Sequence, residues 1–314
     1  MRFLIVFILC FFINTLQAEN LENYLTQKYN YQKLSLLDNY KNFPAPYLIG
    51  EVNENKAYIL FDTGSSGVSI FNSSVKQLKL KEDSRLNHSK NMAGQTSINH
   101  NVILKRIKVG NIILKNVIAN ITNQPKKKQY PTIVIGTNFL KKYNAIFNFS
   151  NNSIYLTTRQ LTPKDHYLIG QKLQVKNYLL INLISLISQR QIMPVAFNKN
   201  SPVNCLVDTG TSDFTVSYSY SKKASLKTTS KKTIKATGGT LTISDTNIAS
   251  LTLNPLNAFY QKRLQLFNLK ATSANIEPLS KFLGVVCVLG FKELEDTKSI
   301  YDFSAARLYI QSDL

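Results

Sequence analysis

The sequence predicts an all-β fold made of two similar lobes, and three observations support this prediction. From Pro46 onward, short apolar runs alternate with turn-forming Asn, Gly and Lys residues, a pattern typical of short strands. The motif Asp-Thr-Gly follows an apolar run twice, at Asp62 and at Asp208. Two apolar residues and a glycine follow each motif downstream, at Gly136 and at Gly290. Because the motif and the glycine recur in the same order in both halves of the chain, they predict two copies of one structural unit.

The chain begins with the features of an export signal. A basic residue precedes the apolar run Phe3–Ile13, and the small residue Ala18 ends the segment. This order is typical of a signal peptide spanning residues 1–18, with an uncleaved membrane anchor as the alternative. We therefore expect a secreted or periplasmic, extracytoplasmic protein. Residues 19–45 are then either a short pro-region or an N-terminal arm packed on the fold.

The first lobe is expected over residues 46–158. Its apolar runs are separated by Asn-Glu-Asn, by Gly110-Asn111 and by a charged break at 126–131. The first two separators are typical of hairpin turns. The expected strands are 47–52, 57–61, 103–109, 112–121 and 133–135. The last of these ends at Gly136, and a short helix is expected after it.

The second lobe is expected over residues 159–314 and repeats the first. The segments Ile146–Ser150 and Ile300–Ser304 are near copies and follow Gly136 and Gly290 at the same spacing. The lobes join somewhere in 157–192, where the apolar run Tyr178–Ile181 is expected to add a strand between them.

The two Asp-Thr-Gly motifs have the composition that a buried carboxylate needs. An Asp at the end of a buried strand is costly unless hydrogen bonds meet its carboxylate. After Asp62, Gly64 lets the backbone turn and bring N–H donors close, while Thr63 and Ser65 offer hydroxyl groups. The second motif, Asp208-Thr209-Gly210-Thr211, repeats this arrangement.

Two such lobes related by a pseudo-two-fold axis would bring the two aspartates face to face. Adjacent carboxylates cannot both ionise cheaply, so the pair would hold one proton. One carboxylate can then take a proton from water while the other protonates a peptide carbonyl oxygen. This chemistry needs no metal, no cofactor and no covalent nucleophile.

At these residues the sequence resembles the aspartic proteases of the pepsin and retropepsin families, over roughly residues 46–314. The resemblance implies a bilobal fold of two β-barrel-like lobes with a cleft between them, and an aspartic endopeptidase, a peptide hydrolase, with Asp62 and Asp208 as its catalytic dyad. It also implies residues that support the two active-site loops: Thr63, Gly64, Ser65, Thr209, Gly210 and Thr211. Gly136 and Gly290 would pack beneath these loops.

The same resemblance implies a β-hairpin flap over the substrate. The candidate turns contain Gly94 in the first half and Gly238 and Gly239 in the second, at similar offsets from their aspartates. Similar offsets favour a retropepsin-like origin in which each lobe contributes a flap. Ordinary hairpin tips are the alternative interpretation.

The cysteines and histidines give no metal-binding pattern. Cys205 and Cys287 remain after signal cleavage, and no Cys-x-x-Cys or His-rich cluster is present, so no structural metal is expected. His88, His100 and His166 stand among polar residues and are expected to be solvated. In the resembled fold the two cysteines lie on strands of one core, so they form either a disulfide, which export permits, or two buried thiols.

The charge of +20 in 314 residues is spread over many single lysines. Without a nucleic-acid-binding motif, we interpret these lysines as solvated surface residues that also attract the protein to anionic surfaces. The expected partner is a peptide or protein substrate bound as an extended strand, with no nucleic acid. A monomer is expected because one chain carries both lobes. The rival interpretation is a catalytically silent peptide-binding or cationic envelope-associated protein on the same fold.

Hydroxyl groups next to both carboxylates predict an acidic activity optimum. Ser65 and Thr211 stand directly after the two motif glycines. Hydrogen bonds to a carboxylate favour its charged form and lower its pKa, so the dyad would lose its activating proton at acidic pH.

Overall fold

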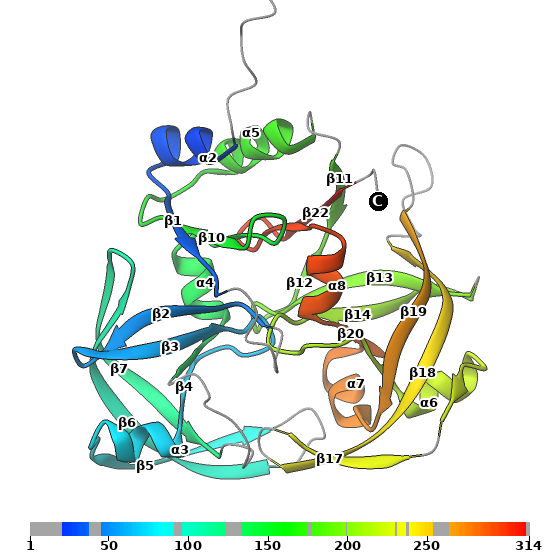
Figure 1. The fold of residues 1–314 in the computed structure, drawn as a ribbon, viewed down its shortest axis with the longest axis horizontal. Helices are drawn as coiled ribbons and strands as arrows, with labels where there is room; N and C mark the ends of the chain where they lie inside the picture. Colours follow the sequence, from blue (N-terminus) through cyan, green and yellow to red (C-terminus); the bar gives the residue numbers. More distant parts are fainter. Residues whose placement is uncertain are drawn as a thin grey trace, which may run out of the picture.

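The computed structural model describes residues 21–37, 45–90, 96–123, 133–174, 178–198, 200–229, 231–236, 239–253 and 264–311. It is an all-β, two-lobed structure in which each lobe contains a closed β-barrel and a third sheet joins the lobes (Figure 1). Within the described ranges, no helix is long and apolar enough to cross a membrane.

The first-lobe barrel closes through six strands in the order β2-β3-β8-β4-β7-β6, with β6 pairing back to β2. The strands are β2 (Tyr47–Val52), β3 (Asn55–Phe61), β4 (Val68–Phe71), β6 (Thr96–Val109), β7 (Ile112–Thr122) and β8 (Ile133–Ile135). β5 (Glu82–Lys90) extends β6 outside the barrel, and the helices are α3 (Asn72–Gln77) and α4 (Thr137–Lys142). The predicted hairpins are confirmed: Asn53 and Glu54 have positive φ at the β2–β3 turn, as does Gly110 at the β6–β7 turn.

The second-lobe barrel has the equivalent order β13-β14-β20-β15-β19-β18, closed by pairing of β18 with β13. Its strands are β13 (Gln191–Phe197), β14 (Val203–Val207), β15 (Thr215–Ser217), β18 (Gly239–Leu253), β19 (Leu264–Ala274) and β20 (Cys287–Leu289). Outside the barrel lie β12 (Ile184–Ser185), β16 (Lys227–Thr228), β17 (Lys232–Ala236), α6 (Tyr218–Lys223), α7 (Glu277–Leu283) and α8 (Phe291–Asp296).

The internal repeat predicted from the sequence is visible strand by strand. In each barrel the strand that carries the motif pairs in parallel with the strand before the downstream glycine: β3 with β8, and β14 with β20. The last paired residues are Phe61 with Ile135 and Val207 with Leu289. The motif and the glycine therefore leave the same end of each barrel side by side.

A six-stranded antiparallel sheet joins the lobes in the order β1-β10-β9-β21-β22-β11. Its strands are β1 (Gln32–Ser35), β10 (Ser153–Leu156), β9 (Ile146–Asn148), β21 (Ile300–Asp302), β22 (Arg307–Gln311) and β11 (Tyr178–Asn182). The two near-copy segments pair with each other at its centre, with Phe147 opposite Tyr301 and the two rings stacked at 6.0 Å. The strand expected at 178–181 is confirmed as β11, which forms one edge.

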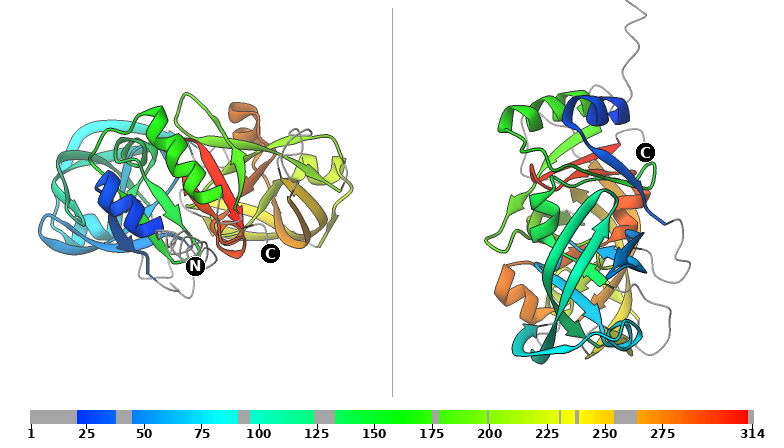
Figure 2. Two further views of the ribbon diagram at one scale, coloured as in Figure 1. Left: turned by 90° about the horizontal axis from the view of Figure 1, so that it is seen from above. Right: turned by 90° about the vertical axis from the view of Figure 1, so that its left-hand side faces the viewer.

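Helical segments cover the outer side of this sheet, away from the barrels. α2 (Leu21–Asn23) and the π-helix η1 (Tyr24–Lys28) lie beside α5 (Pro163–Gln174) at the top of Figure 1, and the views of Figure 2 agree. Leu25 and Tyr29 are fully buried in a cluster with Ile169 and Leu173 of α5. The structure thus packs residues 21–36 onto the sheet, and β1 supplies its other edge.

One apolar core runs through both barrels and the joining sheet. It contains Phe61 of the first barrel, Phe147 and Tyr301 of the sheet, and Phe197 of the second barrel, all fully buried. Each such side chain contributes about 1.5 to 3 kcal/mol through burial. Because the core is continuous, it holds the two lobes in a fixed relation to each other.

Candidate active site

Asp62 and Asp208 leave their barrels at equivalent points. The backbone N–H of Asp62 donates to the carbonyl of Ile135, and that of Asp208 to the carbonyl of Leu289, both at 3.0 Å. These bonds continue the parallel pairing of β3 with β8 and of β14 with β20 by one residue. Both carboxylates are therefore held by rigid strands, which gives the precision that catalytic groups need.

The two motif glycines bring the carboxylates together across the lobe boundary. A Cβ atom added to Gly64 would collide with the carboxylate of Asp208, and one added to Gly210 would collide with that of Asp62. Each carboxylate therefore lies against the glycine of the opposite loop. This close approach explains why both positions require glycine.

The two motif threonines join the loops through a closed set of buried hydrogen bonds. The N–H of Thr63 donates to the hydroxyl oxygen of Thr209 at 3.1 Å, and the N–H of Thr209 to that of Thr63 at 3.0 Å. The Thr63 hydroxyl donates to the carbonyl of Val207 at 2.9 Å, and the Thr209 hydroxyl to that of Phe61 at 2.8 Å. Both threonines are fully buried.

Backbone amides meet both carboxylates, as the sequence predicts. Asp62 Oδ1 accepts from the N–H of Gly64 at 2.8 Å and of Ser65 at 3.1 Å. Asp208 Oδ1 accepts from the N–H of Gly210 at 2.9 Å, and its Oδ2 accepts from the Thr211 hydroxyl at 3.1 Å. Ser65 thus reaches Asp62 through its amide, whereas the sequence predicted its hydroxyl in that role.

The surroundings of Asp62 raise its pKa well above the ordinary carboxyl range. Desolvation by burial is the largest cause, followed by the negative charge of Asp208 and a hydrogen bond with it, while the amides of Gly64 and Ser65 act in the opposite direction. Asp208 is itself only 6% exposed. Two carboxylates so placed cannot both ionise cheaply, which favours one shared proton.

The downstream glycines, Gly136 and Gly290, lie beneath the two Asp-Thr-Gly loops. The N–H of Gly136 donates to the carbonyl of Gly67, and that of Thr137 to the carbonyl of Ser65, both at 2.8 Å. In the second lobe, the N–H of Phe291 donates to the carbonyl of Thr211 at 2.8 Å. A Cβ atom at Gly136 or Gly290 would collide with the backbone of the loop above it.

Glu293 supports the second Asp-Thr-Gly loop, a role that the sequence did not predict. Its Oε1 accepts from the N–H of Phe214 and its Oε2 from the N–H of Gly290, both at 3.2 Å, which caps the start of α8. It is 7% exposed, and burial raises its pKa to about 7. The first lobe has Phe139 at the equivalent position, stacked on Phe61. The available signal was an acidic residue three positions after the glycine, as in a capping box.

A second missed residue, Arg190, crosses from the second lobe to the first. Its Nε donates to the carbonyl of Gly64 at 2.6 Å. It stands between two glutamines in the sequence, a context that gives no signal for a role at the active site.

Each lobe contributes one hairpin at the position expected for a flap. β5 pairs with β6, and β17 pairs with β18, along the edge of the molecule opposite α2 and α5 (Figure 1). Gly239 begins β18 and pairs with Ala236 next to the turn. Gly94 and Gly238 lie outside the described residues.

Cys205 and Cys287 are register partners in β14 and β20, and the structure joins them by a disulfide with a Cα–Cα distance of 4.5 Å. Both are fully buried in the second-lobe core. Of the two alternatives that the sequence left open, the structure therefore contains the disulfide. The bond joins β14, the strand that leads to Asp208, to its neighbour β20.

The expectation of a solvated His166 is wrong. Its side chain is only 13% exposed, and its Nδ1 lies 3.1 Å from Oδ2 of the fully buried Asp302. His100 is more than half exposed and lies 3.9 Å from Glu82, while the side chain of His88 lies outside the described residues. Within the described ranges, no cluster of three or more His, Cys, Asp or Glu residues could hold a metal ion.

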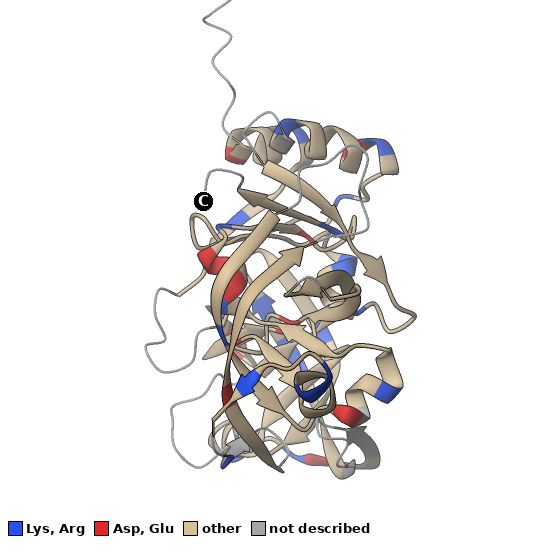
Figure 3. Cartoon of the chain, turned by 90° about the vertical axis from the view of Figure 1, so that its right-hand side faces the viewer, with Lys and Arg blue, Asp and Glu red and all other residues tan. Residues whose placement is uncertain are grey.

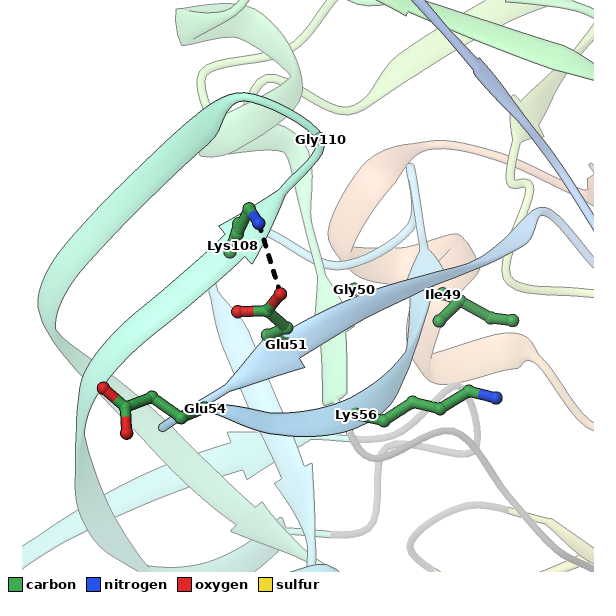
Figure 4. Close-up of a pocket in the computed structure, with 7 residues that line it drawn as sticks. All are labelled: Ile49, Gly50, Glu51, Glu54, Lys56, Lys108 and Gly110. Carbon is green, nitrogen blue, oxygen red and sulfur yellow. Dashed lines mark hydrogen bonds and ion pairs between the residues drawn. The ribbon is translucent and has the colours of Figure 1, made fainter.

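A surface hollow of about 390 Å³ is lined by residues of β2, β3, β6 and their adjoining turns (Figure 4). Glu51 there accepts from Lys108 at 3.2 Å and from Arg106 at 2.9 Å, and these hydrogen bonds lower its pKa. Lys56, which also lines the hollow, is five strand residues from Phe61, or about 16 Å along β3. The hollow is therefore not part of the candidate active site.

Lysine and arginine positions are scattered over the fold, with no single block of one colour in the view of Figure 3. This distribution agrees with the interpretation of the lysines as solvated surface residues.

Comparison with known proteins supports the resemblance at the first motif. Residues 48–139 match the family model described as aspartyl protease, and this range includes Asp62, Gly64 and Gly136. No curated protein matches the chain.

Solved structures also resemble this chain, and two of them illustrate how much of it is matched. One is a retropepsin-like aspartic protease from Rickettsia conorii, at 15% identity and a TM-score of 0.29, covering 40% of this chain and 90% of that one. The other is basic 7S globulin from soybean, at 10% identity and a TM-score of 0.47, covering 90% of this chain and 94% of that one. The predicted resemblance to aspartic proteases is thus confirmed by the family match.

Proposed function

We propose that this protein is an exported aspartic endopeptidase in which Asp62 and Asp208 activate water to hydrolyse peptide bonds. One observation carries the proposal: each carboxylate lies against the motif glycine of the opposite loop, so the pair faces one another at the boundary of the lobes. The rigid loops, the threonine bonds and the raised pKa of Asp62 support the same conclusion.

The hydrogen bonds suggest how the two carboxyl groups divide the work. Asp62, whose pKa is raised, acts as the acid, and Asp208, which accepts hydrogen bonds from the amide of Gly210 and the hydroxyl of Thr211, acts as the base. Asp208 takes a proton from water as the water oxygen bonds to the peptide carbonyl carbon. Asp62 gives its proton to the carbonyl oxygen, and a neutral tetrahedral diol forms.

The second half of the reaction restores the dyad. The proton on Asp208 passes to the amide nitrogen, Asp62 takes a proton back from the diol, and the carbon–nitrogen bond breaks. The products are a carboxylic acid and an amine. The substrate would bind as an extended strand between the two hairpins, because backbone hydrogen bonding recognises peptides without regard to most side chains.

The test is hydrolysis of a peptide library by residues 19–314, with and without a statine-type inhibitor. Asp62→Asn and Asp208→Asn should each lower kcat/KM by more than about a thousandfold, because both carboxyl groups act as one unit. Thermal melting should show that both variants remain folded. Near wild-type turnover in either variant would contradict the dyad, and peptide binding without hydrolysis would favour a catalytically silent peptide-binding protein.

A further inference from the structure

Arg190 is held in a fixed position at the junction of the lobes. It ends a tight turn between β12 and β13, in which the N–H of Leu186 donates to the carbonyl of Arg190 at 2.8 Å. The turn is fastened to the first lobe by the Thr137 hydroxyl, which donates to the carbonyl of Ser188 at 3.2 Å. On the other side, the buried Gln191 donates to the carbonyl of Phe303 at 2.7 Å.

The guanidinium of Arg190 lies beside the dyad. Its Nε donates to the carbonyl of Gly64 at 2.6 Å. The same glycine donates its N–H to Asp62 and lies against the carboxylate of Asp208. One residue therefore separates the guanidinium from both catalytic carboxyl groups.

Most of the hydrogen-bonding capacity of Arg190 is unused in the part of the chain that the structure describes. A guanidinium has five N–H donors, and only the Nε–H has a partner there, with no ion pair to any carboxylate. Other arginines use their terminal nitrogens: Arg106 Nη1 donates to Glu51, and Arg307 Nη1 donates to the carbonyl of His166. Arg190 is partly buried, but its terminal nitrogens are not among the described buried atoms that lack a hydrogen-bond partner, so they are open to solvent and to a ligand.

We propose that Arg190 is a specificity-determining residue that binds an acidic side chain of the substrate next to the scissile bond. This inference rests on the proposed function. A carboxylate matches the planar fork formed by the free Nη groups and can accept two hydrogen bonds from it. The chain's charge of +20 attracts acidic peptides at long range, but only a local contact makes cleavage depend on where in the peptide the acid stands.

The experiment compares peptides that carry Glu or Gln at each position around the scissile bond in turn. For the wild type, kcat/KM should favour Glu at one position by at least about tenfold, the size expected for hydrogen bonds between charged groups. Arg190→Gln should bring that ratio to about one, and Arg190→Glu should reverse it in favour of a Lys peptide. Lys115→Gln, which removes one exposed charge from β7, should keep the wild-type ratio.

Two results would overturn the inference. One is a wild-type ratio near one at every position, and the other is a preference for Glu that survives in Arg190→Gln. Fluorescence anisotropy of the same peptides with Asp62→Asn separates this inference from the proposed function. Tighter binding of the Glu peptide that disappears in the Asp62→Asn, Arg190→Gln double variant would uphold the subsite even if the wild type hydrolysed nothing.

Discussion

Thr63 and Thr209 each accept, on the side-chain hydroxyl, the backbone N–H of the other, at 3.0 and 3.1 Å. Each hydroxyl in turn donates to a carbonyl of the opposite lobe's strand, that of Val207 or Phe61. All four bonds cross the lobe boundary in a region without water access, since both threonines are fully buried. The relative position of the two catalytic loops is thus set by side chains one residue from the dyad.

We expect Thr63→Val to destabilise the protein and to impair catalysis together. Valine keeps the shape but leaves the buried N–H of Thr209 and the carbonyl of Val207 without partners, and each unsatisfied group costs about 1 to 3 kcal/mol. Urea unfolding and kcat/KM measure the two effects. Thr63→Ser keeps the hydroxyl and should restore most of both.

The pair can also be tested for coupling. In a double-mutant cycle, Thr63→Val and Thr209→Val should show an interaction free energy above about 0.5 kcal/mol, because they share hydrogen bonds. Simple additivity of the two free energies of unfolding would show that the bonds across the boundary do not act as a set.

The pH dependence of activity should follow the asymmetry of the dyad. Activity is lost on the alkaline side when the shared proton leaves, and the raised pKa of Asp62 places this loss above the ordinary carboxyl range. The Thr211 hydroxyl donates to Oδ2 of Asp208 at 3.1 Å and helps to hold that carboxylate in place. Thr211→Val removes this hydrogen bond and should lower kcat/KM by about tenfold, the effect of losing one hydrogen bond to a charged group, while Thr211→Ser should retain most of the activity.

This expectation modifies the acidic optimum predicted from two hydroxyl groups. Among the described residues, Thr211 alone donates its hydroxyl to one of the two carboxylates, because Ser65 reaches Asp62 through its amide. In a pH–rate profile with an uncharged peptide, an alkaline limb within the ordinary carboxyl range would contradict the raised pKa of Asp62.

Glu293 should make the folded protein less stable as pH rises. Burial raises its pKa from 4.5 to about 7, so the folded state binds a proton that the unfolded state has released. Its contribution is most favourable below about pH 4.5 and declines until about pH 7, by up to about 3 kcal/mol. Glu293→Gln, which resembles the protonated form, should flatten this slope in urea unfolding measured from pH 4 to pH 8.

The control for Glu293 is the exposed Asp296 at the end of the same helix. Asp296→Asn should retain the wild-type slope. An equal slope in the wild type and in Glu293→Gln would mean that the carboxyl group ionises in the folded state as easily as in the unfolded one.

The dyad and the barrels were predictable because their requirements are local in the sequence. An Asp at the end of an apolar run needs nearby amides, and the glycine and hydroxyl residues that provide them are its immediate neighbours. The two near-copy segments that contain Phe147 and Tyr301 revealed the repeat because they lie at the same distance in sequence from Gly136 and Gly290. Their pairing with each other did not follow from that spacing, since equivalent segments can also pair only within their own lobes.

The remaining features depend on contacts far apart in the chain. β1 and β11 are edge strands whose partners, β10 and β22, are fixed by tertiary packing and not by their own composition. Arg190 reaches Gly64 across the lobe boundary from an ordinary polar turn. His166 looked solvated because its neighbours are polar, but α5 places it against the buried Asp302.

The disulfide between Cys205 and Cys287 should be detectable in the mature protein. The intact mass without reductant should be lower by two hydrogens than after reduction, and neither thiol should alkylate. Because the bridge closes a loop of 82 residues, the chain-entropy treatment assigns it about 4 to 5 kcal/mol, with measured values often smaller. A folded protein with two alkylated cysteines would contradict the bond.

The packing of the N-terminal segment predicts that residues 21–36 are a structural arm of the fold and not a removable inhibitor. Leu25 and Tyr29 are fully buried beneath α5, and β1 completes the joining sheet, on the side opposite the two hairpins. Tyr29→Ala should therefore cost about 3 to 5 kcal/mol, as for other large buried aromatics, whereas Gln27→Ala, at an exposed position of the same helix, should be nearly neutral.

Truncation tests the same point at the level of function. A chain that starts at Asp38 loses the edge strand and the buried cluster, so it should melt at lower temperature or aggregate, with no gain in kcat/KM over residues 19–314. If residues 19–45 were instead a pro-region, the longer chain would be inactive until cleaved, and the truncated chain would be stable and more active. Comparing melting temperature and peptide hydrolysis for the two chains decides between these outcomes, because a structural arm and an inhibitory segment predict opposite changes in both quantities.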